Sequence, residues 1–85
     1  LLVARVDGTV ETAARLLRDF RSPEPTVLAV AGGEAGIAAV DAPAGEVLET
    51  AADAVGGSAL GRGTRGYARF DAGVEPLVEA VREAL

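Results

Sequence analysis

The two most apolar stretches of the chain are separated by only four residues, and they constrain its fold more than any other feature. Residues 26–31 (T-V-L-A-V-A) form a nearly continuous apolar run, and residues 36–40 (G-I-A-A-V) form the second. The segment between them, Gly32-Gly33-Glu34-Ala35, is short enough for a β-hairpin. We therefore expect two antiparallel strands that are neighbours in one sheet.

Apolar periodicity predicts the remaining elements around this hairpin. Alternating or β-prone residues predict strands at 2–6 and 67–70. Apolar residues at helical spacing predict helices over about 10–20, 44–55 and 72–85. The order is then β-α-β-β-α-β-α. This predicts an α+β fold in which helices pack on a small, mostly antiparallel sheet, with the split β-α-β type as one form of it.

The length of 85 residues fits a single small domain over residues 1–85. The chain starts at Leu1-Leu2-Val3 without methionine, so we expect it to be a piece of a longer polypeptide. It has no cysteine, which excludes disulfides and thiolate metal sites. No stretch is typical of a signal peptide or a membrane span, so we expect a cytoplasmic protein with no membrane partner.

The residue types argue against catalysis within this chain. Histidine, cysteine and lysine are absent, and Ser22 and Ser58 are the only serines, so the usual pairs of nucleophile and base cannot be assembled. We expect no cofactor. Two sets of carboxylates at helical spacing could be metal ligands or an acid/base pair, but solvated helix faces are the favoured interpretation. These carboxylates are Glu46, Glu49 and Asp53 in one helix and Glu75, Glu79 and Glu83 in the other.

The stretch 56–66 concentrates glycine and positive charge. It holds five of the eleven glycines and two of the eight arginines, in a chain whose net charge is −5. Residues 62–70 contain three arginines and no acid. We expect a loop that leads from a helix into the strand at Tyr67. Backbone N–H groups and arginines in such a loop can contact an anion, but a flexible connection with solvated arginines is the alternative.

Gly61 to Gly66 also matches the G-x-G-x-x-G pattern of dinucleotide-binding proteins. That pattern needs a preceding strand and a following helix, whereas a helix is expected before it here and a strand after it. We reject the dinucleotide interpretation, and the absence of Gly-Lys-Ser/Thr excludes a P-loop. Contact with nucleic-acid phosphates remains, with Tyr67 either stacking on a base or packing on a neighbouring helix. The candidate nucleic-acid-binding residues are Gly61, Arg62, Gly63, Thr64, Arg65, Gly66, Tyr67 and Arg69.

The element order, the start Ala4-Arg5-Val6-Asp7-Gly8, the pair Gly56-Gly57 and the glycine-rich stretch together resemble the DHH-associated C-terminal domain. This domain ends alanyl-tRNA synthetases and occurs in related phosphoesterases and single-strand exonucleases. The synthetase motif runs approximately G-G-x-G-G-G-R-P-x-x-A-Q-G-G. Its glycines, arginine and alanine align with Gly61, Gly63, Arg65 and Ala68, whereas Gly66 replaces its proline, Arg69 its glutamine and Ala72-Gly73 its last glycine pair.

The resemblance implies an accessory domain that positions tRNA or single-stranded nucleic acid for a catalytic domain elsewhere in the parent chain. The Asp-His-His motif of the phosphoesterases belongs to another domain, and this chain has no histidine. Some members of the family self-associate, so a homodimer is a further expectation. The alternative function is an oligomerisation or regulatory module of ferredoxin-like type, in which the glycine-rich stretch only connects two elements.

Overall fold

The computed structural model describes residues 1–6, 9–10, 12–14, 16, 26–40 and 42–85. The described strands are β1 (Leu2–Arg5), β2 (Thr26–Ala31), β3 (Glu34–Ala39), β4 (Ser58–Arg62) and β5 (Arg65–Arg69). Two helices, α2 (Ala44–Ala54) and α3 (Val74–Ala84), follow β3 and β5 respectively. Residues 10, 12–14 and 16 are also helical. The predicted α+β class is confirmed.

The five strands form one sheet in the order β1-β2-β3-β5-β4. β1 pairs with β2 in parallel, and every other pairing is antiparallel. The predicted hairpin of β2 and β3 is confirmed, and it turns at Gly32-Gly33. Gly32 has a φ of +58°, a conformation that glycine adopts without a steric penalty. β4 lies at one edge of the sheet, beside β5.

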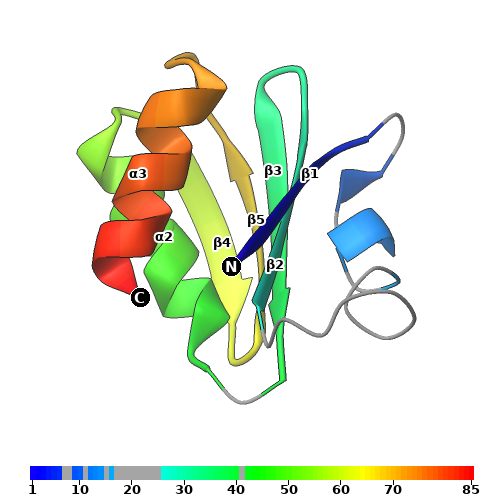
Figure 1. The fold of residues 1–85 in the computed structure, drawn as a ribbon. Coiled ribbons are helices and arrows are strands. Elements are labelled where there is room, and N and C mark those ends of the chain that lie inside the picture. The colour runs from blue at the N-terminus through cyan, green and yellow to red at the C-terminus, as the bar shows by residue number, and fades with distance from the viewer. Residues whose placement is uncertain (7–8, 11, 15, 17–25, 41) are drawn as a thin grey trace.

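Helices cover both faces of the sheet, but unequally. α2 and α3 lie together on one face, and helical residues 12–14 lie on the opposite side (Figure 1). On the first face, Leu28, Ile37 and Ala68 pack with Leu48 of α2 and Leu77 of α3 in the main core. On the second face a smaller cluster contains Val10, Ala14, Ala29 and Ala38. Because both faces of β2 and β3 are covered, these strands are apolar almost throughout, as their sequences indicated.

The prediction of a loop over residues 56–66 is wrong for most of its length. The helix does end at this point, with Gly56 at a φ of +78°, but Ser58–Arg62 form β4 and β5 begins at Arg65. The order is therefore β-α-β-β-α-β-β-α. Because glycine is depleted in strands, the glycine-rich sequence did not predict the strand β4. The structure supplies the reason for glycine here, because a helix packs directly against the backbone of this hairpin.

The other boundaries differ from the predictions by only a few residues. β3 and β5 each begin two residues earlier than predicted, since β3 starts at Glu34 and β5 at Arg65. α3 begins at Val74, two residues later than predicted. Of the predicted helix at 10–20, Val10 and Ala14 are buried, whereas Leu17 and Phe20 lie outside the described residues. No helix in the described part of the chain is long and apolar enough to cross a membrane.

Candidate functional site

The β4–β5 hairpin places the predicted cationic residues on one face of the sheet. Arg62 lies opposite Arg65, Leu60 lies opposite Tyr67, and Ser58 lies opposite Arg69. Because successive side chains of a strand point to opposite faces, these six residues share a face. The alternate residues Gly66 and Ala68 are buried toward α2 and α3, together with Phe70. The alternation that predicted a strand at 67–70 is therefore confirmed, because Tyr67 and Arg69 lie on one face and Ala68 and Phe70 on the other.

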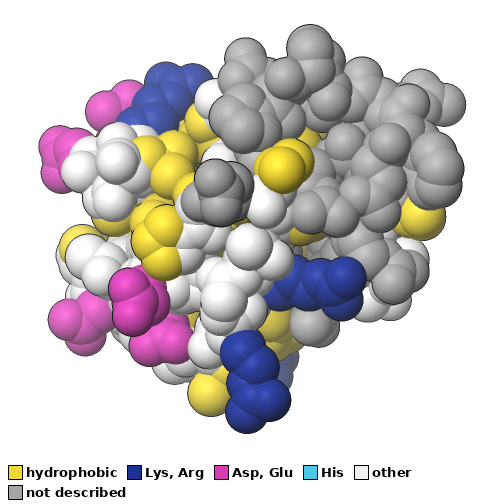
Figure 2. All heavy atoms as spheres, turned by 90° about the horizontal axis from the view of Figure 1, so that it is seen from below, with side chains coloured by type: hydrophobic (Ala, Val, Ile, Leu, Met, Phe, Trp, Pro, Cys, Tyr) yellow, Lys and Arg dark blue, Asp and Glu magenta, His cyan; other side chains and the backbone are white. Residues whose placement is uncertain are grey.

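The arginines of this face are exposed and have no acidic partner among the described residues. Arg62, Arg65 and Arg69 are all exposed, and none of them forms a salt bridge within the described part of the chain. Figure 2 shows the side of the molecule that carries the β4–β5 turn, with basic side chains in the lower middle of the view and a further basic side chain beside an acidic one at the upper left. Like charges directly opposite each other in a sheet are destabilising. The pair of Arg62 and Arg65 therefore leaves positive potential available to a ligand.

The turn that joins β4 and β5 is fixed by both of its carbonyl groups. It consists of Gly63 and Thr64, and Gly63 has a φ of +56°, as the first position of a type II′ hairpin requires. The Gly45 N–H at the start of α2 donates to the Gly63 carbonyl at 3.0 Å. The Ala39 N–H at the end of β3 donates to the Thr64 carbonyl at 2.9 Å. The backbone between the two arginines is thus held by two separate elements.

Gly61 and Gly66 let the first turn of α2 pack against the hairpin. A Cβ at Gly61 would lie 2.3 Å from Gly45 Cα, and a Cβ at Gly45 would lie 2.6 Å from Arg62 N. A Cβ at Gly66 would lie 3.2 Å from side-chain atoms of Ile37 and Leu48. These glycines therefore serve close packing of backbones. The Gly61 N–H is also already bonded, because it donates to Glu49 Oε1 at 3.1 Å.

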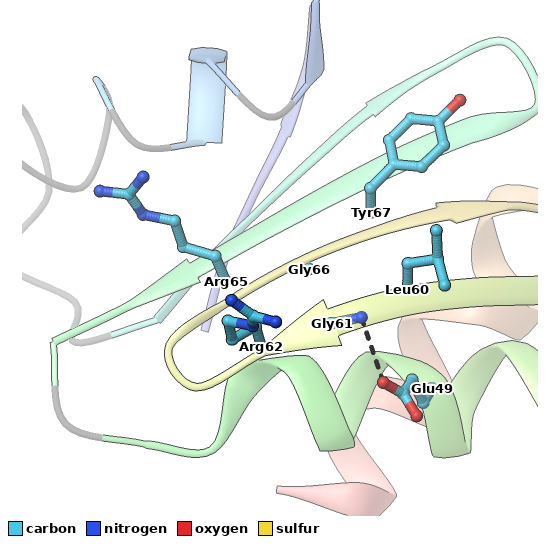
Figure 3. A pocket seen from close by; sticks show the side chains of 7 residues that line it. All are labelled: Glu49, Leu60, Gly61, Arg62, Arg65, Gly66 and Tyr67. Atoms are coloured by element: carbon cyan, nitrogen blue, oxygen red, sulfur yellow. Dashed lines mark hydrogen bonds between the residues drawn. The ribbon is translucent and has the colours of Figure 1, made fainter.

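An open hollow of about 490 Å³ lies at the outer edge of this hairpin. Figure 3 shows Leu60 and Tyr67 on one side of β4 and Glu49, from α2, on the other side. The residues that line the hollow are Glu49, Leu60, Gly61, Arg62, Arg65, Gly66 and Tyr67. The hollow combines apolar side chains, two guanidinium groups and one carboxylate. Its volume is in the range of small-molecule sites, about 300 to 1,000 Å³.

Tyr67 both packs and lines the hollow, so the two interpretations of this residue are not exclusive. Its ring is half-buried against the cluster of Val10, Ala29 and Ala38. Its hydroxyl donates a hydrogen bond to the carboxylate of Glu34, which lies on β3. A ring that is fixed in this way loses little conformational entropy when a ligand stacks on it.

Most of the predicted site residues meet at this hollow. Gly61, Arg62, Arg65, Gly66 and Tyr67 line it, Gly63 and Thr64 form the adjacent turn, and Arg69 lies on the same face at the other end of β5. The G-x-G-x-x-G pattern spans the end of β4, the turn and the start of β5, so no helix follows it to receive a pyrophosphate.

Sequence reasoning missed Leu60 and Glu49. Leu60 lay in the predicted loop, and S-A-L-G-R from 58 to 62 lacks the alternation of polar and apolar residues that would have indicated a strand. Glu49 was grouped with the exposed carboxylates of its helix, and its contact with Gly61 joins residues twelve apart. The six carboxylates of α2 and α3 named above are all exposed, and no three acidic side chains in the described residues are grouped to hold a metal ion.

Comparison with known proteins gives a family without an assigned activity. The family model described as "Uncharacterized protein rrnAC1427, C-terminal domain" matches residues 1–83. A curated protein of Haloarcula marismortui, "Uncharacterized protein rrnAC1427", is 44% identical over 87 residues. The match covers 100% of this chain and 24% of that protein, so the chain spans about a quarter of its relative's length. Neither description names a ligand, a reaction or a DHH-associated domain.

Proposed function

Because this chain belongs to the rrnAC1427 C-terminal domain family, whose curated relative is about four times as long, we propose that it is an accessory nucleic-acid-binding domain of a larger protein. In this proposal it holds tRNA or another single-stranded nucleic acid for a catalytic domain elsewhere in the parent chain, and it has no reaction of its own. The resemblance to the DHH-associated domain supports the same role and suggests a cytoplasmic phosphoesterase, exonuclease or alanyl-tRNA synthetase-like parent.

One observation carries the proposal: three exposed arginines and a tyrosine lie on a single face of the β4–β5 hairpin. The described residues leave the guanidinium groups of Arg62, Arg65 and Arg69 without salt bridges, so they are available for phosphate oxygens. Tyr67 and Leu60 lie directly opposite each other on the same face and offer an apolar surface to a base. Phosphate contacts beside an aromatic surface are typical of proteins that bind single strands.

The test is a titration of the domain with labelled tRNA, single-stranded RNA and single-stranded DNA, followed by fluorescence anisotropy. We expect weak binding, with a Kd of about 10⁻⁴ to 10⁻⁶ M at physiological salt. The Arg62→Ala/Arg65→Ala variant should bind at least roughly tenfold more weakly, because the loss of even one hydrogen bond to a charged group costs about 1.5 to 3 kcal/mol.

A charge-matched control separates this site from a general electrostatic effect. The Arg5→Ala/Arg82→Ala variant removes two exposed arginines from β1 and α3, outside the hairpin. It should retain close to the original affinity. If neither RNA nor DNA binds, or if both double variants lose the same affinity, the proposal is wrong.

The alternative function, an oligomerisation or regulatory module, makes a different prediction. Sedimentation of the isolated domain would then show a tight dimer. The titrations described above would then show no affinity for nucleic acid. The bond from Gly61 to Glu49 occupies one of the N–H groups at the outer edge of β4, which limits pairing of this edge with a second sheet.

A further inference from the structure

Leu60 and Glu49 are the features of the hollow that phosphate binding does not use. Leu60 is 79% exposed, the most exposed of the large apolar residues in the described chain. Glu49 places a negative charge beside Arg62 and Arg65, in a hollow that otherwise suits an anion. A carboxylate at a phosphate site weakens the attraction of the phosphate, so it needs another explanation.

The position of the Glu49 carboxylate is fixed by the backbone of β4. Its Oε1 atom accepts the Gly61 N–H at 3.1 Å, which ties the side chain of α2 to the edge of the sheet. An ionised carboxylate is only an acceptor and has about four lone-pair sites, so one such bond leaves most of its capacity unused. Figure 3 shows the carboxylate below Gly61 and Leu60 above it. A planar group that lies along the outer edge of β4 can therefore contact Leu60 with one face and Glu49 with its edge.

We infer that the hollow takes one unpaired guanine, with its Watson–Crick edge on Glu49, one face on Leu60 and its phosphate on Arg62 and Arg65. Guanine is the base that offers two adjacent donors, N1–H and the N2 amino group, to the two oxygens of a carboxylate. Uracil and thymine offer a single N–H between two carbonyl oxygens, and these oxygens repel a carboxylate. Adenine and cytosine donate only through one amino group. This inference rests on the proposed nucleic-acid binding and adds base selectivity to it.

Tyr67 and Arg69 extend the site along β5. Both side chains lie on the same face as Leu60, and Arg69 is four residues from Arg65. At a rise of about 3.3 Å per residue, the two arginines are separated by roughly 13 Å of strand. A neighbouring nucleotide can therefore place its base on Tyr67 and its phosphate on Arg69. Only the nucleotide beside Glu49 is selected by base type, because any base can stack on a tyrosine.

The experiment compares oligonucleotides of about 8 residues, within the usual site size of single-strand binders. Oligouridine is titrated beside the same strand with one central guanosine, adenosine or inosine. We expect the guanosine strand to bind roughly tenfold more tightly than oligouridine, as a good bidentate base contact provides. Inosine lacks the N2 amino group and should fall between the two. DNA strands of the same sequence show whether the 2′-hydroxyl group of the sugar contributes to affinity.

The decisive variant is Glu49→Gln. Its amide oxygen can still accept the Gly61 N–H, so the fold is expected to persist, and thermal unfolding verifies this. We expect the guanosine preference to fall to about twofold or less, while the oligouridine affinity rises slightly because a negative charge beside the phosphate site is lost. Glu46→Gln removes a charge from an exposed position of the same helix that does not line the hollow, and it should keep the preference.

The outcomes separate this inference from the proposed function. If all strands bind equally well, or if Glu46→Gln and Glu49→Gln lose the guanosine preference alike, the assignment of Glu49 is wrong and nucleic-acid binding still stands. If no strand binds the unmodified domain, both proposals are wrong.

Discussion

At the scale of single residues, the glycines of the hairpin serve packing before they serve binding. A Cβ at Gly61 would lie 2.3 Å from Gly45 Cα and 2.6 Å from the Gly45 carbonyl oxygen, and backbone atoms cannot move aside as a side-chain end can. We therefore expect Gly61→Ala to lower the free energy of unfolding by about 3 kcal/mol or more. Gly73→Ala is the control, since Gly73 has a φ of −64° and a Cβ there would meet Pro76 Cδ at 3.5 Å, an ordinary van der Waals contact. Urea unfolding measures both variants, and equal losses would contradict this role of Gly61.

At the scale of elements, the β4–β5 hairpin has two like charges paired across its strands next to the turn, and this pair destabilises the hairpin. Arg62 and Arg65 are cross-strand partners, and like charges in this position oppose strand pairing. Arg62→Glu should raise the free energy of unfolding by about 0.2 to 1 kcal/mol, because the new pair is attractive. The same substitution should abolish nucleic-acid binding. Chemical unfolding at low salt measures the gain, and the gain should shrink at about 1 M salt, where charges are screened. A stability that is unchanged at low salt would argue against repulsion between these arginines.

At the scale of the whole molecule, the small cationic face must bind nucleic acid although the chain carries a net charge of −5, which repels phosphates. The three arginines of the hairpin face can contact about three phosphates. Each phosphate contact to a single strand contributes about −0.7 to the slope of the logarithm of affinity against the logarithm of salt concentration. We therefore expect a slope of about −2. In Arg62→Ala/Arg65→Ala the slope should approach about −0.7. Anisotropy titrations over a series of salt concentrations measure both slopes. A steeper slope would show that basic residues outside the hairpin contribute to the contact.

The fold was predictable wherever apolar periodicity carries the signal. Both strands of the β2–β3 hairpin and the apolar side of α3 follow directly from the spacing of valine, leucine and isoleucine. β4 was not predictable in this way, because its five residues contain a glycine and a single large apolar side chain, and that side chain is exposed. Propensity therefore argued for a loop at a place where strand pairing with β5 and contact with α2 determine the conformation.

The sequence by itself determined the α+β class, the elements of the core and the concentration of arginines near Gly63, because these depend on local composition and periodicity. Only the tertiary structure decided that Arg62 and Arg65 are cross-strand partners, that Gly61 is needed for the approach of α2, and that Glu49 reaches the edge of β4. Each of these contacts either joins segments that are distant in the chain or depends on the register of paired strands. The spacing of residue types along the sequence specifies neither long-range contacts nor strand register.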